Sequence, residues 1–407
     1  MWQKGWMRMN PWIADFPILA ADENGNRLVY LDSAATTQHP TQVLDAVADY
    51  YRRDNANPHR GVYELAMRAT DAHENARHTV AKFFNAQDDE IVFTQNTTES
   101  LNLVAYSYGL HFLHAGDEIA LSVAEHHSNL VPWQRVAAAT GAKLVYLYPD
   151  EGGHLTEQEL DKKITGRTKL VAVAMVSNVL GLRAPVESIV RRAHAVGAVV
   201  VLDCAQSAPH VPVDVKALDV DFAACSAHKL YAPMGVGALY AKRALLDKMP
   251  PFLSGGDMIA AVHEQTATYA EGPRKFEAGT RNVGGEVGFA AALDYMTAIG
   301  WQTLQQHEHA LLKQMLDGMR AMPWPSTASR RRMIAAAWSA SMCRTYTPTM
   351  SPPFWMPAAW RCARGITAPS RLWNTSASAA AAAPALPCTT PRRTSTPCCK
   401  IWKTSER

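Results

Sequence analysis

The chain contains 407 residues, of which 48% are hydrophobic and 19% are charged, and its formal net charge is +3. This length suits a large hydrophobic core and, by default, an enzyme of two domains. No apolar run approaches the roughly 20 residues that a membrane-spanning helix needs, and the small net charge argues neither for nor against a nucleic-acid partner. We expect neither nucleic acid nor a membrane among the partners.

Residues 1–28 are predicted to be a short lead-in segment. Two basic residues, Lys4 and Arg8, precede Asp15 without a continuous apolar core, so the pattern does not fit a signal peptide. The chain has seven cysteines but no Cys-x-x-Cys pair, which suggests neither a zinc site nor a redox motif. A reducing cytosol fits this cysteine usage best, and we predict a cytoplasmic protein.

The composition changes abruptly near residue 325. Residues 1–325 carry 28 Lys and Arg against 36 Asp and Glu, whereas residues 326–407 carry 12 against 1. All fifteen histidines lie before this point, and five of the seven cysteines lie after it. A basic disordered tail would explain the charge, but the five tryptophans and five cysteines of the tail fit that explanation badly.

Strand-like apolar runs alternate with helical stretches in the first part of the chain. The predicted strands lie at 90–94, 118–123, 143–148, 170–177, 198–204, 222–225 and 236–240. The predicted helices lie at 97–107, 129–139, 156–164 and 185–197. Near-continuous apolar strands separated by helices are typical of an α/β fold, with a mostly parallel sheet covered on both faces. Such sheets bind ligands at the carboxyl ends of their strands.

Two of these strand ends carry groups that suit an anion or an aromatic ring. Thr97 and Thr98 open a helix, where free backbone N–H groups can bind a phosphate. A plain helix N-cap is the simpler explanation of the two threonines. His126 and His127 follow the next strand, and because adjacent histidines rarely converge on one ion, we predict no metal site. A single imidazole over an aromatic ligand and an ordinary surface pair remain as alternatives.

Three further strand ends carry Asn178, Asp203 and Lys229. An aspartate that closes so apolar a strand is unfavourable unless it meets a cation or a strong donor, although it could equally cap the next helix. Lys229 follows the apolar run 222–225. Burial there would lower the pKa of the lysine and make its amine a nucleophile for a carbonyl. A lysine whose amine reaches solvent is the alternative.

Together these strand ends describe one ligand. An aldehyde for the lysine, a phosphate for the threonines and a pyridine nitrogen for the aspartate are the features of pyridoxal phosphate. The sequence therefore predicts a pyridoxal phosphate site in which Lys229 is held as a Schiff base.

Eight segments carry a resemblance to a known family. They are YLDSAATTQHP (30–40), HRGVYELA (59–66), NTTESLN (96–102), EHHSNLVPWQ (125–134), VSNVLG (176–181), DCAQSAPH (203–210), SAHKLYAPMGVGALY (226–240) and RKFEAGTRN (274–282). In order and spacing they resemble the group II (SufS-type) cysteine desulfurases, a branch of the class V aminotransferases. The resemblance runs from about residue 12 to about residue 322. Ala227 and Ala232 stand where the family usually has glycine.

The resemblance implies a fold and a set of roles. The fold is that of pyridoxal-phosphate-dependent transferases of fold type I, with a seven-stranded sheet in the large domain and a small C-terminal α/β domain. Lys229 and His126 would be catalytic, and His126 would stack on the cofactor ring. Asp203 would pair with the pyridinium nitrogen, and Gln206 would reach the ring hydroxyl.

The remaining implied roles concern the phosphate and the substrate. The residues that would bind the phosphate are Thr97, Thr98, Ser226, His228 and, from the other subunit, Thr280. The contribution of Thr280 implies a homodimer. Asn178 would lie near the substrate carboxylate, and His59 and Arg60 would line the entrance to the site.

The implied reaction converts L-cysteine, or L-selenocysteine, to L-alanine and leaves sulfur as a persulfide on an enzyme cysteine. The sulfur would pass to an acceptor protein of the SufE or SufU kind for iron-sulfur cluster assembly. In the family the cysteine lies in an RxGHHCAxP loop, and an arginine in RASxxxYNT holds the substrate carboxylate. Neither motif occurs in this chain.

The tail contains traces of both motifs in another reading frame. If each codon starts at the third base of the printed one, residues 365–374 permit His-His-Cys-Ala and residues 381–391 permit Arg-Ala-Ser-Leu-Ala-Leu-Tyr-Asn-Thr. We therefore hypothesise a frameshift near residues 322–326, which would place the missing cysteine across Thr367 and Ala368. If the printed tail is real, desulfurase activity should be lost or crippled.

We predict four parts of the chain: the lead-in 1–28, a large cofactor-binding domain 29–298, the start of a small domain 299–325, and an aberrant tail 326–407. One rival function is another class V pyridoxal phosphate enzyme, such as selenocysteine lyase, kynureninase or an epimerase. A second rival is a cofactor-binding but inactive truncated paralogue. A dehydrogenase is excluded because no glycine-rich fingerprint follows the first strand.

Overall fold

The computed structural model of the protein describes residues 12–321. The chain divides into two compact units, 1–364 and 365–407, of which the second lies wholly outside the described residues. The predicted tail, 326–407, and the motif traces within it also lie outside them. The predicted domain limits stay predictions.

One sheet of seven strands forms the centre of the described residues. The strands are β1 (Ile91–Thr94), β2 (Glu118–Ser122), β3 (Lys143–Leu147), β4 (Thr168–Ala174), β5 (Val199–Asp203), β6 (Phe222–Ser226) and β7 (Gly237–Ala241). Their order in the sheet is β1-β7-β6-β5-β4-β2-β3. The pairs from β3 to β6 are parallel, whereas β7 runs antiparallel to both β1 and β6. The predicted mostly parallel seven-stranded sheet is confirmed.

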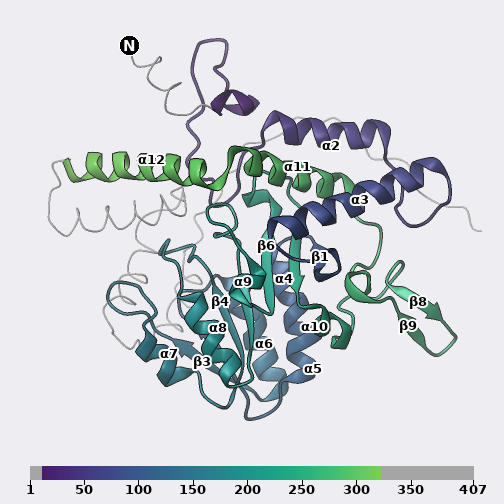
Figure 1. Cartoon of the computed structure of the whole chain (residues 1–407), viewed down its shortest axis with the longest axis vertical. Helices are drawn as coiled ribbons and strands as arrows, with labels where there is room; N and C mark the ends of the chain where they lie inside the picture. The colour runs from purple at the N-terminus through teal and green to yellow at the C-terminus, as the bar shows by residue number, and fades with distance from the viewer. Residues whose placement is uncertain (1–11, 322–407) are drawn as a thin grey trace, which may run out of the picture. The chain divides into compact units, whose positions relative to one another are not determined.

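Helices cover both faces of this sheet (Figure 1). They are α2 (Thr41–Arg53), α3 (Glu64–Phe83), α4 (Thr97–Val104), α5 (Leu110–Phe112), α6 (Val131–Thr140), α7 (Glu157–Lys163), α8 (Val186–Ala195), α9 (Val215–Leu218), α10 (Arg243–Lys248), α11 (Val283–Ile299) and α12 (Trp301–Ala321). Within β5, Val200 packs into one hydrophobic cluster and Val201 into a second one. The first cluster includes residues of α3, α8 and α11, and the second includes residues of α4, α6 and α10. Because successive side chains of a strand point to opposite faces, burial on both faces requires the continuous apolar runs seen in the sequence.

The helix predicted at 97–107 is longer and less regular than expected. It begins as α4, widens into a π-helix at Ala105–Gly109 and ends as α5 at Phe112. At the end of the widened turn, Gly109 lies close to α6, where a Cβ would come within 3.0 Å of Val136. Sequence periodicity alone does not show such a widening.

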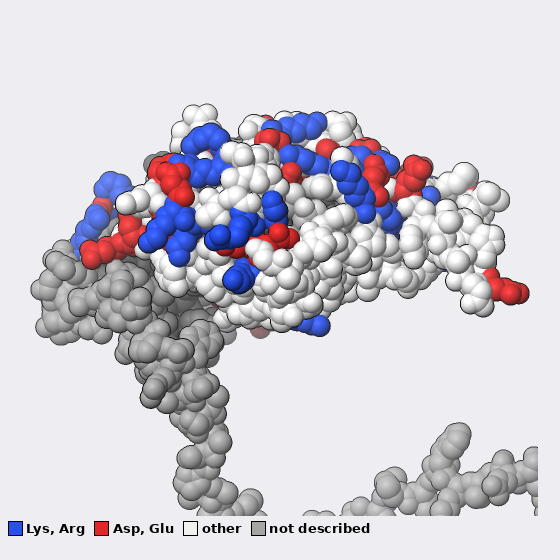
Figure 2. Space-filling view, turned by 90° about the horizontal axis from the view of Figure 1, so that it is seen from below, with Lys and Arg blue, Asp and Glu red and all other residues white. Residues whose placement is uncertain are grey.

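Helix α11 packs against both α2 and α3, although it is distant from them in sequence, and α3 also contacts β1 (Figure 1). A hairpin of β8 (Ile259–Val262) and β9 (Ala267–Tyr269) precedes α11, and all seven of its strand residues are exposed. On the face shown in Figure 2, basic and acidic side chains lie interspersed. Among residues 12–321 the structure contains no helix long and apolar enough to cross a membrane.

Candidate active site

The sheet topology brings the predicted strand ends to one edge. β7 is antiparallel to both β1 and β6, so β1 runs parallel to β6 and to the strands beyond it. The carboxyl ends of β1, β2, β4, β5 and β6 therefore share an edge. The residues at or just after these ends include Thr97, Thr98, His126, Asn178, Asp203, Ser226, His228 and Lys229. Such an edge is where open α/β sheets bind ligands.

Hydroxyl groups gather at the N-terminus of α4. The backbone N–H of Thr97 donates to Ser226 Oγ at 2.8 Å, and the two hydroxyl oxygens lie 2.7 Å apart. Thr98 Oγ1 lies 2.8 Å from Ser128 Oγ. Thr97 and Ser226 are buried, while Thr98 is exposed. Hydroxyls and helix N–H groups at one point suit a phosphate.

Gly237 allows this close approach. A Cβ at this position would lie 2.7 Å from both the Cα of Asn96 and the carbonyl oxygen of Cys225. Only glycine lets β7 pass so near the turn that leads into α4.

Charged groups of opposite sign meet beside the hydroxyl cluster. Burial raises the pKa of Asp203, while a hydrogen bond from the N–H of Ala205 and the charges of Lys229 and His126 lower it. Burial and then the charge of Lys229 lower the pKa of His126, whose ring is exposed. Because these effects require proximity, Asp203, His126 and Lys229 share one site. The buried carboxyl group of Asp203 and the exposed imidazole of His126 thus lie at the same edge of the sheet.

Lys229 is less buried than the sequence led us to expect. It lies in a short 3-10 helix, Ala227–Lys229, that begins where β6 ends, and its burial is intermediate. The lysine was expected to be buried, and it is only partly so because it stands in the turn that follows β6. A partly exposed amine remains accessible to a ligand.

The segment 34–39 holds the turn that carries Lys229. Thr37 donates to the carbonyl oxygen of His228 through both its N–H and its hydroxyl, at 2.9 Å each. The Thr37 hydroxyl accepts from the N–H of Tyr231, and Gln206 Nε2 donates to the carbonyl oxygen of Ala34 at 3.1 Å. Sequence reasoning gave Thr37 and Ala34 no role, and their only signal was the motif at 30–40.

Two of the predicted site residues at this edge have a buried polar atom without a hydrogen-bond partner among the described residues, Asn178 at Oδ1 and His228 at Nδ1. A buried polar atom without a partner is unfavourable and calls for an explanation. A bound ligand would supply partners for both. These orphan atoms, the hydroxyl cluster and the charge pair fit pyridoxal phosphate.

Three predicted residues gather at a second place. His59 Nε2 lies 3.3 Å from Glu74 on α3, and Arg60 Nε donates to Asp257 at 3.0 Å. Thr280 is exposed on the loop before α11, and the N–H of neighbouring Gly279 donates to the carbonyl oxygen of Gly256. Arg60 and Thr280 are thus joined through the loop at 256–257.

His59, His73 and Glu74 lie close enough to hold a metal ion. A guanidinium group already occupies this cluster, because Arg77 lies 2.7 Å from His73 Nε2 and donates to Glu74 at 3.0 Å. The positive charge of Arg77 opposes the binding of a cation there.

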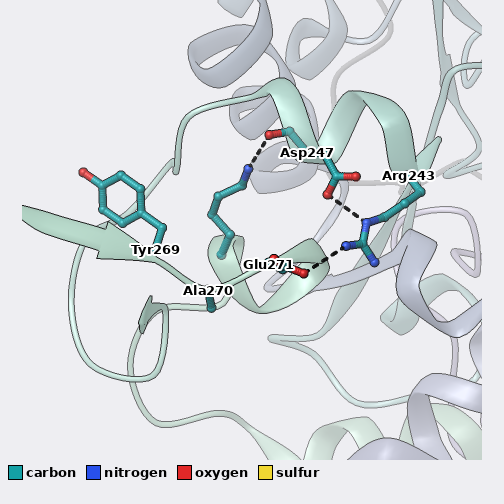
Figure 3. Close-up of a pocket in the computed structure, with 6 residues that line it drawn as sticks. Arg243, Asp247, Tyr269, Ala270 and Glu271 are labelled. Atoms are coloured by element: carbon teal, nitrogen blue, oxygen red, sulfur yellow. Dashed lines mark hydrogen bonds and ion pairs between the residues drawn. The ribbon is translucent and has the colours of Figure 1, made fainter. Parts of the chain in front are cut away.

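A cavity of about 410 Å³ lies elsewhere, at the foot of the β8–β9 hairpin (Figure 3). Its lining comprises Arg243, Asp247, Tyr269, Ala270, Glu271 and Lys275, none of which was predicted as a site residue. Arg243 is paired with Asp247 at 2.8 Å and with Asp89 at 2.9 Å. Because these carboxylates compensate the charge of Arg243, this side chain is less available to a charged ligand.

Glu125 is a further residue that sequence reasoning missed. Asn129 Nδ2 donates to its carboxylate at 2.7 Å, and Trp133 Nε1 donates to Asn129 in turn. Burial of the carboxyl group, helped by the nearby charge of Asp203, raises the pKa of Glu125 to about 8, although hydrogen bonds from Asn129 and Ala174 lower it in part. A neutral acid thus stands next to the candidate site near pH 7.

Comparison with known proteins identifies the class. The sequence profile of the aminotransferase class-V family matches residues 29–338. The chain belongs to this family, which confirms the predicted fold and the pyridoxal phosphate cofactor.

Within this family, the chain is similar to cysteine desulfurases. A probable cysteine desulfurase of Streptomyces coelicolor is 48% identical over 78% of each chain, and a cysteine desulfurase of Pectobacterium atrosepticum is 47% identical over 76% of this chain and 77% of its own. The crystal structure of the cysteine desulfurase CsdA of Escherichia coli matches with a TM-score of 0.71 and 41% identity over 77% of each chain. A cysteine desulfurase of Thermococcus onnurineus gives a TM-score of 0.72 at 41% identity, over 78% of each chain. The predicted relationship to cysteine desulfurases is confirmed.

Proposed function

We propose that this chain is a pyridoxal-phosphate-dependent cysteine desulfurase that converts L-cysteine to L-alanine and releases sulfur to a thiol. The observation that carries the proposal is the meeting of Asp203, His126 and Lys229 beside the Thr97–Ser226 hydroxyl pair. The relatives named cysteine desulfurase share about three quarters of their length with this chain.

The roles of the residues follow from their chemistry. When bound, the cofactor takes up the electrons of bonds broken in the substrate. Asp203, buried at the end of β5, would keep the ring nitrogen protonated. Lys229 Nζ would attach the cofactor and move protons to and from the substrate carbon. His126 would cover the ring and exclude water from it.

The phosphate and substrate groups are proposed in the same way. Thr97, Thr98 and Ser226 would bind the phosphate through their hydroxyls, and His228 through its unpaired Nδ1. Gln206 has a second amide N–H beyond the one bound to Ala34, and this would reach the ring hydroxyl. Asn178 would orient the substrate carboxylate.

The thiol that receives sulfur is not one of the two cysteines in residues 12–321. Cys204 and Cys225 are 0% and 1% exposed. Burial raises the pKa of Cys225 to about 12 and that of Cys204 well above its usual range, so neither forms a thiolate. The acceptor would therefore be a cysteine outside the described residues, a small thiol, or an acceptor protein of the SufE or SufU kind serving iron-sulfur cluster assembly.

A homodimer in which Thr280 serves the partner's site is part of the proposal. Its support is the exposed apolar surface that follows Arg60, where Val62 is 97% exposed and Tyr63 and Met67 more than half exposed. Large exposed apolar side chains that cluster mark interaction surfaces. His59 and Arg60 would then line the entrance near this interface.

One experiment tests the activity. The purified chain is loaded with pyridoxal phosphate, and alanine and sulfide are measured from L-cysteine with and without dithiothreitol. We expect bound cofactor, and alanine formation that depends on added thiol if the tail provides no acceptor. The Lys229→Ala variant should lose both the bound cofactor and the formation of alanine. Bound cofactor without alanine under either condition would reject the desulfurase and leave a cofactor-binding protein. L-selenocysteine and kynurenine as substrates separate the rival enzymes.

Mixed dimers test the subunit arrangement. Lys229→Ala and Thr280→Ala chains are each defective, but a mixed dimer restores one complete site if Thr280 acts across the interface. We expect cofactor affinity to recover in the mixture. If it does not, Thr280 acts within its own chain or not at all.

A further inference from the structure

In the part of the chain that the structure describes, side chains and not another strand cover the outer edge of β1. Within residues 12–321, β1 is the first strand of the sheet and pairs only with β7. Arg77 Nη1 donates to the carbonyl oxygen of Ile91 at 2.7 Å, and the N–H of Phe93 donates to Glu277 Oε1 at 2.7 Å. Arg281 Nη2 donates to the carbonyl oxygen of Phe93 at 2.8 Å. Three charged side chains thus satisfy backbone groups that an edge strand leaves open.

The side chains that cover this edge belong to a buried ionic network. Arg77 and Glu277 form a two-pronged ion pair, with nitrogen–oxygen distances of 2.8 and 2.9 Å. His73 lies 2.6 Å from Glu286 through Nδ1 and 2.7 Å from Arg77 through Nε2. Although burial raises the pKa of Glu277, Arg77 and then Arg281 lower it to about 2. Glu277 is therefore ionised, and each buried charge has a partner.

This network anchors the loop that carries Thr280 at residues before and after the threonine. Glu277 and Arg281, four residues apart, bind the N–H and the carbonyl of the same residue, Phe93. Between them, Gly279 has a φ of 86° and its N–H donates to the carbonyl oxygen of Gly256 at 2.9 Å. The backbone of the loop is thereby fixed at three points, while the Thr280 side chain remains exposed.

We propose that Glu277 and Arg281 are positioning residues: they fix the loop so that the Thr280 hydroxyl can bind a cofactor phosphate. Arg77 supports them through its ion pair with Glu277. The inference rests on the proposed role of Thr280. Glu277 and Arg281 contact β1 and act on the cofactor only through the loop they fix. Their effect on cofactor affinity is exerted through Thr280 and vanishes when Thr280 is absent.

A double-mutant cycle tests this inference, with affinity for pyridoxal phosphate as the readout and with dimerisation measured by analytical ultracentrifugation. The variants are Thr280→Ala, Arg281→Gln and their combination, made in the full chain. Arg281→Gln is preferred to Glu277→Gln because Arg281 is partly exposed and its loss spares the buried pair. Arg274→Gln, an exposed arginine of the same segment, is the matched control.

We expect Arg281→Gln to weaken cofactor binding about as much as Thr280→Ala, roughly tenfold or more, and the combination to be no weaker than Thr280→Ala alone. Arg274→Gln should bind as the unchanged chain does. Additive losses, or normal affinity in Arg281→Gln, would overturn the positioning role. Normal affinity in Thr280→Ala would overturn the inference together with the proposed role of Thr280. The assay of alanine formation is separate, so failure of the desulfurase proposal is recognised independently.

Discussion

The hydroxyl oxygens of Thr97 and Ser226 lie 2.7 Å apart, although 129 residues separate them in the chain. The contact joins the start of α4 to the end of β6. It exists because β7 lies between the two elements with a glycine, Gly237, at the point of closest approach. This polar contact of the candidate site thus depends on a residue with no side chain.

Gly237→Ala should disturb this contact. The added methyl would meet backbone atoms at 2.7 Å, and backbone has little freedom to yield. We expect a loss of about 1–3 kcal/mol in the free energy of unfolding and at least tenfold weaker binding of pyridoxal phosphate, measured by chemical denaturation and by cofactor titration. Gly255→Ala is the control, because its methyl would meet only Ala278 at an ordinary 3.7 Å. Equal behaviour of the two variants would contradict the account.

Glu277→Gln should destabilise the protein in a pH-dependent way. Removing one partner of a buried ion pair costs about 3–5 kcal/mol. The pKa of Glu277 falls from its ordinary 4.5 to about 2 in the folded chain, so its stabilising effect is present above pH 4.5 and is lost as the pH falls towards 2. Urea denaturation between pH 2 and 7 should show this slope in the unchanged chain and a smaller one in the variant. Glu271→Gln, whose side chain is 94% exposed, should retain the slope.

Glu125→Gln should reveal a pH dependence of the opposite sign. The pKa of Glu125 rises from its ordinary 4.5 to about 8 on folding, so the folded state holds a proton that the unfolded state has lost. Stability then decreases as the pH rises from 4.5 to 8. The variant should be less sensitive to pH across this window in thermal denaturation. An unchanged slope would mean that Glu125 is ionised in the folded protein.

Cys204 and Cys225 should resist thiol reagents in the folded chain. Both are buried, and burial raises the pKa of both thiols. The chain is labelled with iodoacetamide at pH 8 and its peptides are analysed by mass spectrometry. Both cysteines should stay unmodified in buffer. Both should be modified in roughly 6–8 M urea, which unfolds a domain of this kind. Rapid labelling of either cysteine in buffer would contradict the conclusion that neither of them accepts the sulfur.

The sheet was predictable from sequence because its strands are buried on both faces. The runs at 143–148 and 222–225 match β3 and β6 within about one residue. The site was predictable to the extent that it consists of strand ends, as for Asp203 and Ser226. Contacts between distant segments were not predictable, because nothing local in residues 34–39 indicates that Thr37 binds the turn of Lys229.

The two edges of the sheet are protected against strand addition by different means. At β3 the first residue is an exposed lysine, Lys143, which disfavours pairing with another chain. At β1 the protection comes from Arg77, Glu277 and Arg281, whose side chains already occupy the backbone groups that an incoming strand would need. Any damage that releases the loop at 277–281 would also uncover this edge. Such damage should therefore show itself as aggregation of the protein as well as weaker cofactor binding.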